Sequence, residues 1–314
     1  MRLASLFVAF LVTATSFSAA AAEPIKELNI SYVKPPFVLQ LLVMKNHKLL
    51  EKEFQADGIK INWHNMGTSP QAARAMSSGS LDIAGNMNTA ALLMLNSEGL
   101  PVRVVTGTAH PTSNLAIVSK PGTELSVKDL KGKQVVGPKG TFLHQLLVAA
   151  LEKEGMRESD VQFINMGIPK ALSTILAGHA DAALVASSAL IKANKAGAKT
   201  IINAEGLVEP TLVMTTTKQF AEEHPDIVKR VDKVYAESLR WMKDHPSETA
   251  EMGAKEHGIS IEDAKTLMER SHYFDKMTTK DLEDLKVNQK FLRDNGMMRN
   301  EVTVEELVLP VAME

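Results

Sequence analysis

Short apolar runs alternate along the chain with longer stretches in which apolar residues recur every three or four positions. The short runs predict β-strands, and they fall at 28–33, 59–66, 83–87, 133–137, 161–166 and 182–186. Helices are expected at 37–45 and 141–154 and from Pro70 and Pro169 onward, since proline is favoured in a first helical turn. Strands that alternate with helices predict an α/β fold with a parallel, doubly wound sheet in each half.

The two halves share a repeated pattern of letters. FVLQLLV at 37–43 returns as FLHQLLV at 142–148, and Asn-Met-Gly closes a strand-like run at 65–67 and again at 165–167. Further matches keep the same order, including Pro70 with Pro169 and Asp82 with Asp181. Two copies are too few for a solenoid, so the repeat predicts two similar domains. Both aspartates precede a strand, where we expect them to bind backbone N–H groups rather than a ligand.

Polar residues follow several of the predicted strands, and ligands in open α/β sheets bind beyond the carboxyl ends of the strands. If the halves face each other, helix N-termini converge on one cleft, and their free N–H groups favour a small anion. We therefore predict a ligand site built from strand-end and neighbouring loop residues: Lys34, Phe37, Thr68, Asn86, Asn88, Thr89, Lys139, Thr141, Phe142, His144, Ser187 and Glu209.

Several of these candidates have a second interpretation. Thr141 can cap its own helix as well as meet a ligand, and both phenylalanines can pack as core. Lys34 and Lys139 can remain solvated, whereas Glu209 suits an ammonium group if the ligand is zwitterionic. His144 replaces Leu39 of the first copy, which makes it a candidate for ligand specificity.

Composition narrows the class of protein. The formal net charge is −2 and there is no cysteine, so nucleic acid is not an expected partner and no disulfide or lipidated cysteine is available. The histidines lack metal-site spacing, and the glycine pair at 132 and 137 lacks the rest of a phosphate loop. We expect no metal, no cofactor and no catalytic residue.

The first 22 residues differ from the rest of the chain. Arg2 precedes an apolar run that ends in the small residues Ala20, Ala21 and Ala22. This pattern is typical of a cleaved secretory signal peptide and is too short for a membrane span. We therefore expect residues 1–22 to be removed and the mature chain to be a periplasmic monomer without a lipid anchor.

Five blocks of sequence resemble one known family, and they lie at 32–40, 77–92, 128–156, 176–190 and 215–246. Among them are SSGSLDIAGNMNTAAL, LAGHADAALVASSAL and a block that contains GPKGTFLHQLLVAALEKEGM. The chain resembles the solute-binding proteins of ABC importers, in the nitrate, sulfonate, bicarbonate and taurine group with the type II periplasmic-binding fold. The resemblance implies a receptor that closes on a small anionic or zwitterionic solute and delivers it to a membrane permease.

The resemblance also implies an architecture. Residues 23–109 and 213–314 are expected to form a first lobe with the C-terminal helices, and 115–208 a second lobe, with hinges near 110–114 and 209–212. Two other functions remain open at this point. One is an enzyme of the pyrimidine-biosynthesis type on the same fold, although those relatives carry a cysteine-rich motif. The other is a periplasmic sensor that docks on a signalling partner.

Overall fold

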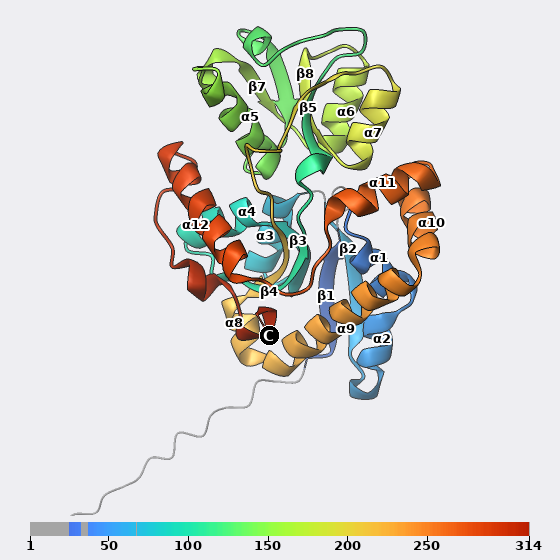
Figure 1. The fold of residues 1–314 in the computed structure, drawn as a ribbon. Coiled ribbons are helices and arrows are strands. Elements are labelled where there is room, and N and C mark those ends of the chain that lie inside the picture. The colour runs from blue at the N-terminus through green and yellow to red at the C-terminus, as the bar shows by residue number, and fades with distance from the viewer. Residues whose placement is uncertain (1–24, 33–36, 67, 314) are drawn as a thin grey trace, which may run out of the picture.

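The computed structural model describes residues 25–32, 37–66 and 68–313 and contains two β-sheets, one above the other in Figure 1. The expected signal peptide and Lys34 lie outside these residues. The first sheet has the order β2-β1-β3-β10-β4, with strands β1 (Glu27–Tyr32), β2 (Lys60–Asn65), β3 (Ile83–Asn88), β4 (Val102–Ala109) and β10 (Leu212–Thr217). The second has the order β7-β6-β8-β5-β9, with strands β5 (Leu115–Ser119), β6 (Gln134–Gly137), β7 (Gln162–Asn165), β8 (Ala182–Ala186) and β9 (Thr200–Asn203).

The α/β class is confirmed, but the sheets are mixed rather than parallel. In each sheet the fourth strand of the order, β10 or β5, runs antiparallel to both of its neighbours. These two strands directly follow the segments in which the chain crosses from one sheet to the other. They enter their sheet from the opposite lobe, and this reverses their direction relative to strands that are connected by helices.

The first sheet carries α1 (Leu39–Asn46), α2 (Leu49–Glu53), α3 (Ser69–Ser77) and α4 (Thr89–Ser97), and the second carries α5 (Phe142–Lys153), α6 (Ile168–Leu176) and α7 (Ser188–Lys195). Helices α1, α3, α5 and α6 lie where the sequence predicts helices, whereas α2, α4 and α7 are additional. Thr68 caps α3 and Thr141 caps α5 through their hydroxyl groups, which satisfies backbone N–H groups that the helix leaves free. Gly79 and Gly178 end α3 and α6 with φ of 70° and 74°, which glycine adopts without a steric penalty.

Asp82 and Asp181 bind backbone, as the sequence predicts. The Asp82 carboxylate accepts the Asn29 N–H of β1 at 2.7 Å, and the Asp181 carboxylate accepts the Gln134 N–H of β6 at 3.2 Å. Each therefore ties the start of one parallel strand to its neighbour. The repeat preserves this role in both sheets.

Five helices follow the last strand: α8 (Lys218–Glu223), α9 (Pro225–Asp244), α10 (Pro246–His257), α11 (Ile261–Ser271) and α12 (Thr279–Asp294). Helix α8 ends just before Pro225, which occupies the first turn of α9. Val228, Val231 and Tyr235 of α9 pack in one apolar cluster with α1 and β1. Short 3-10 helices complete the chain: η1 (Gln55–Asp57), η2 (Thr112–Asn114), η3 (Lys128–Leu130), η4 (Glu158–Asp160), η5 (Val304–Leu307) and η6 (Pro310–Ala312).

The C-terminal helices lie on both sides of the region where the lobes meet, with α12 on one side and α10 and α11 on the other (Figure 1). The Gln145 side chain of α5 donates to Asn288 Oδ1 of α12 at 2.8 Å. An apolar cluster that includes Leu93, Leu146 and Leu285 continues from the first lobe through the second to α12. The two lobes are thus in contact.

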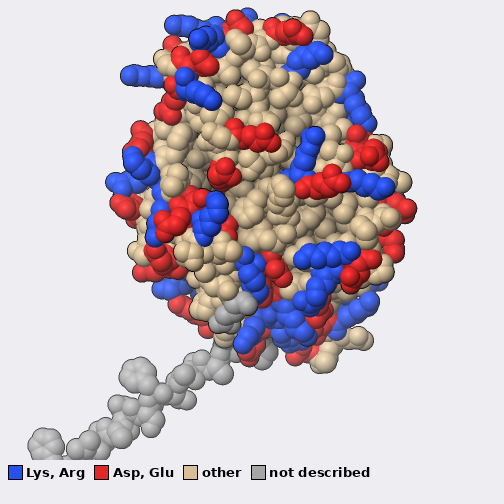
Figure 2. Space-filling model, viewed as in Figure 1, with Lys and Arg blue, Asp and Glu red and all other residues tan. Residues whose placement is uncertain are grey.

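The surface carries both signs of charge. Figure 2 shows acidic and basic side chains interspersed over the visible face, in agreement with the small formal net charge of −2. Within the part of the chain that the structure describes, no helix is long and apolar enough to cross a membrane.

Candidate functional site

A pocket lies between the two lobes, at the carboxyl ends of the parallel strands. Its volume is about 80 Å³, on a scale where one water needs about 10–15 Å³. The first lobe contributes the polar residues Thr68, Ser69, Asn86 and Asn88. The second lobe and the connecting segments supply mostly apolar residues: Pro111, Leu115, Pro138, Thr141, Phe142, Leu143, Ile168, Ala186, Pro210 and Leu212.

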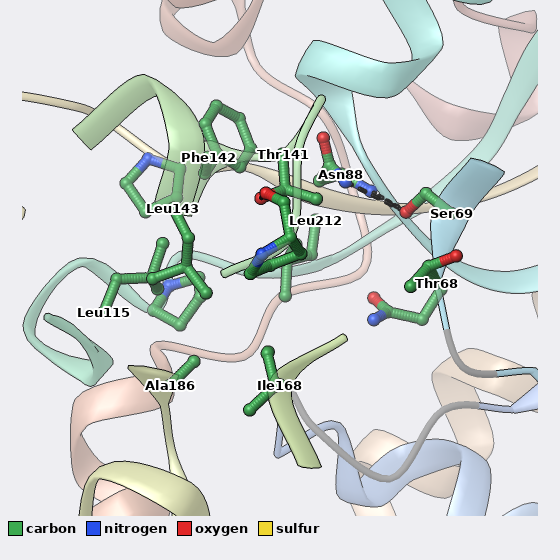
Figure 3. Close-up of a pocket in the computed structure, with 14 residues that line it drawn as sticks. Thr68, Ser69, Asn88, Leu115, Thr141, Phe142, Leu143, Ile168, Ala186 and Leu212 are labelled. Carbon is green, nitrogen blue, oxygen red and sulfur yellow. Dashed lines mark hydrogen bonds between the residues drawn. The ribbon is translucent and has the colours of Figure 1, made fainter. Parts of the chain in front are cut away.

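Asn88 and Ser69 form a fixed pair at the polar end (Figure 3). Asn88 is the last residue of β3, and its Oδ1 caps α4 by accepting the Ala91 N–H at 2.8 Å. Its Nδ2 donates to Ser69 Oγ at 2.9 Å, and its backbone N–H donates to the same oxygen at 3.3 Å. The acceptor sites of the Ser69 hydroxyl are therefore used within the protein, whereas its proton has no acceptor among the residues that the structure describes.

Thr68 and Asn86 show the same arrangement. Thr68 Oγ1 accepts the Gln71 N–H at 3.3 Å, and Asn86 Oδ1 accepts the Thr108 hydroxyl at 3.3 Å. Among the described residues, neither the Thr68 hydroxyl proton nor the Asn86 Nδ2 group has an acceptor. Together with Ser69, these pocket-lining residues carry hydrogen-bond donors that have no acceptor among the described residues. Such a group of donors suits an oxyanion.

The second-lobe wall is different in character. The Thr141 hydroxyl donates to Pro138 O at 2.9 Å and accepts the His144 N–H at 3.4 Å, so its proton is used in the turn that begins α5 and is not offered to the pocket. In Figure 3, Thr68, Ser69 and Asn88 lie on one side of the pocket, and Leu115, Leu143 and Ala186 lie on the other. The pocket therefore has a polar end and an apolar end.

Five of the predicted site residues line this pocket: Thr68, Asn86, Asn88, Thr141 and Phe142. Three more are buried in other surroundings. Phe37 packs against the His257 ring with centroids 4.7 Å apart, which agrees with its core interpretation. The Thr89 N–H donates to Thr211 O at the start of α4. Ser187 is fully buried before α7, and its N–H donates to Asn114 O.

The remaining candidates lie away from the pocket lining. Lys139 and Glu209 are exposed side chains. His144 is only 2% exposed, stacks on Phe163 with ring centroids 4.9 Å apart, and lies with its Nε2 3.2 Å from Glu158 Oε1. Burial lowers the pKa of His144, although Glu158 opposes that effect. His144 therefore faces η4 rather than the pocket.

The residues missed from the sequence are mainly apolar. Ser69, Pro138 and Ile168 lie just beyond strand ends, where the rule for open α/β sheets places ligands. Leu115, Leu143, Ala186 and Leu212 carry no polar group that would single them out. The repeat could have identified two of the missed residues. Ser69 and Ile168 are equivalent first residues of α3 and α6, each followed by a proline, and both line the pocket.

The chain has two α/β lobes with a pocket between them. This geometry is that of a two-lobed ligand-binding protein. The comparisons agree, because residues 53–249 match the model of the NMT1/THI5 like family. The chain belongs to this family, and its resemblance to solute-binding proteins is confirmed.

Two curated relatives and one solved structure illustrate the likeness. The putative aliphatic sulfonates-binding protein of Bacillus subtilis (strain 168) is 26% identical over 252 residues, 78% of this chain and 74% of the relative. The taurine-binding periplasmic protein of Escherichia coli (strain K12) is 29% identical over 180 residues, 56% of this chain and 55% of the relative. The alkanesulfonate-binding protein SsuA from Xanthomonas axonopodis pv. citri, bound to MOPS, shares the fold with a TM-score of 0.80 at 20% identity, over 92% of this chain and 99% of that one.

Proposed function

We propose that this chain is the periplasmic receptor of an ABC importer and captures a small oxyanion-bearing solute between its lobes. The observation that carries the proposal is the polar end of the pocket, where the donors of Thr68, Ser69 and Asn86 have no acceptor among the described residues. A charge-assisted hydrogen bond contributes about 1.5–3 kcal/mol, so a few of them support micromolar binding. The names of the curated relatives support a sulfonate as the oxyanion.

The cellular setting follows from the same proposal. The relatives include a protein named as periplasmic, and the first 22 residues have the pattern of a signal peptide. The mature chain then acts as a monomer that carries solute to a permease in the inner membrane. The segments near 110–114 and 209–212 serve as hinges that open and close the pocket, and the protein is a carrier, not an enzyme.

A thermal-shift panel tests the proposal. Solute at about 100 times its dissociation constant stabilises the folded state by about 2.7 kcal/mol, which raises the melting temperature visibly. Alkanesulfonates, taurine, nitrate and bicarbonate form the test set, and the cation choline is the control. We expect at least one sulfonate to raise the melting temperature and choline to leave it unchanged. A shift with choline alone would overturn the proposal.

A further inference from the structure

The pocket lining differs between the two copies of the repeat. Ser69 begins α3 and Ile168 begins α6, and each precedes the proline of its first turn. Both residues line the pocket, yet one offers a hydroxyl and the other an aliphatic side chain. Asn86 of the first copy corresponds in the repeat to Val185 of the second. The copies have therefore diverged into a polar side and an apolar side.

The apolar side is continuous. Leu115 enters it from β5, Leu143 from α5, Ile168 from α6 and Ala186 from the end of β8. Figure 3 shows Leu115, Leu143 and Ala186 gathered opposite the Asn88–Ser69 pair. A solute whose polar head meets the donors of the first lobe must place its other end against these side chains. Contact with them favours hydrocarbon, because it removes apolar surface from water.

Among the described residues, no carboxylate lines the pocket to bind a second, positive group on the solute. The lining side chains that the structure describes are all uncharged. Glu209 adjoins the pocket residue Pro210, but its side chain is exposed and its charge acts on Lys280 of α12. A buried ammonium group without a negatively charged partner is strongly disfavoured.

From this asymmetry we infer that the solute is an organic monoanion with an uncharged, apolar body, and that the pocket rejects zwitterions. The head lies toward Ser69 and Asn86, and the body lies toward Leu115 and Ile168. The inference rests on the proposed receptor function and selects one chemical class within it. Short alkanesulfonates have this chemistry, whereas aminosulfonates such as taurine do not.

Propane-1-sulfonate and taurine form a matched pair, since they have the same chain length and differ by a methyl group in place of an ammonium group. Titration calorimetry of the full mature chain with each compound measures the discrimination. We expect propane-1-sulfonate to bind at least ~10-fold more tightly, because the pocket leaves the ammonium unpaired. Equal affinity, or tighter binding of taurine, would overturn the inference while leaving the receptor function intact.

A variant moves the preference in the opposite direction. Ile168→Glu places a carboxylate at the apolar end, and the first turn of α6 tolerates an acid because of the helix dipole. We expect this variant to bind taurine more tightly and propane-1-sulfonate at least ~10-fold more weakly than the original chain. An unchanged ratio of the two dissociation constants in a variant with a native melting curve would contradict the placement of the solute body.

Glu209→Gln is the matched control. If Glu209 does not meet the solute, the ratio of the two affinities stays as in the unmodified chain, whereas a selective loss of taurine binding would assign an ammonium site to Glu209 and overturn the inference. The unmodified chain supplies the main comparison, so the test does not depend on the folding of either variant. If neither sulfonate binds the unmodified chain at millimolar concentration but nitrate or bicarbonate does, the inference fails and the receptor function stands. If none of these oxyanions binds, the proposed function and the inference both fail.

Discussion

The side-chain oxygen of Asn86 accepts a hydrogen bond inside the protein, whereas its Nδ2 group has no acceptor among the described residues. The Thr108 hydroxyl occupies its Oδ1, which orients the amide so that Nδ2 remains a donor. The side chain is 4% exposed, so water does not easily replace a ligand there. The sequence predicts Asn86 as a site residue, because it is polar near the end of a strand whose neighbours are apolar.

Asn86→Ala should weaken binding of an alkanesulfonate by about 10- to 100-fold, since it removes one charge-assisted hydrogen bond. Titration calorimetry measures the change. Asn46→Ala, at an exposed position at the end of α1, is the matched control and should bind as the unmodified chain does. Unaltered affinity in Asn86→Ala would remove this residue from the site.

Ser187 has a strained backbone. Its φ of 50° and ψ of −123° place it in a region that glycine occupies readily and other residues avoid. Its hydroxyl is fully buried and has no hydrogen-bond partner among the described residues. The sequence could identify Ser187 as a polar strand-end residue, but it could not predict the strain.

Replacement by glycine should relieve that strain. We expect Ser187→Gly to stabilise the fold by about 1 kcal/mol, because a strained conformation costs about 1–3 kcal/mol and glycine loses some of that gain through unfolded-state entropy. Ser187→Val should lower stability, since a branched side chain tolerates positive φ poorly. Urea unfolding compares the three chains. A less stable glycine variant would contradict the assignment of strain.

At the scale of elements, the two copies of the repeat share their strands and helices, but equivalent side chains have different hydrogen-bond partners. Gln40 and Gln145 occupy equivalent positions, yet Gln40 Nε2 donates to Thr108 O at 3.0 Å whereas Gln145 Nε2 donates to Asn288 on α12. Strand and helix positions could be predicted, because hydrophobic spacing, prolines and glycines mark them locally. The antiparallel direction of β5 and β10 could not, since it depends on how the chain crosses between lobes.

The clearest difference between α1 and α5 is Leu39 against His144. Burial lowers the pKa of His144, with Glu158 raising it and Lys139 lowering it further. A histidine whose folded pKa is depressed supports folding above its unfolded pKa of about 6.5, and that support is lost as pH falls. Acidification therefore destabilises the chain through His144.

His144→Leu, which restores the residue of the first copy, should remove this dependence. We expect the free energy of unfolding of the unmodified chain to fall relative to that of the variant as pH decreases below about 6.5. Urea titrations at a series of pH values measure the difference. A difference that stays constant through this range would contradict the neutral, buried state of His144.

At the scale of the whole molecule, α7 of the second lobe is joined to the C-terminal helices. Lys192 Nζ donates to His257 O at 2.5 Å, Ser188 Oγ lies 3.1 Å from His257 Nδ1, and Lys195 pairs with Asp263 of α11. Helix α10 in turn packs on α1 of the first lobe, where Ala250 and Ala254 meet Leu39 and Val43. These contacts hold the lobes together on one side of the pocket.

Loss of a contact across the lobes should favour an open arrangement. We expect Lys192→Met to enlarge the radius of gyration in X-ray scattering without solute and to weaken solute binding a few-fold, since the apparent affinity falls with the closed fraction. Lys131→Met, at an exposed position in the second lobe, serves as the control. Unchanged scattering and affinity in Lys192→Met would show that this contact does not stabilise closure.

The position of the bound oxyanion is the central prediction, and a crystal structure of the chain with propane-1-sulfonate measures it directly. The predicted result places sulfonate oxygens within about 3.2 Å of Ser69 Oγ and Asn86 Nδ2, with the alkyl chain against Leu115 and Ile168. Two results would contradict this prediction. The sulfonate could bind outside the pocket, or its head could lie against the second lobe while its chain points to Ser69.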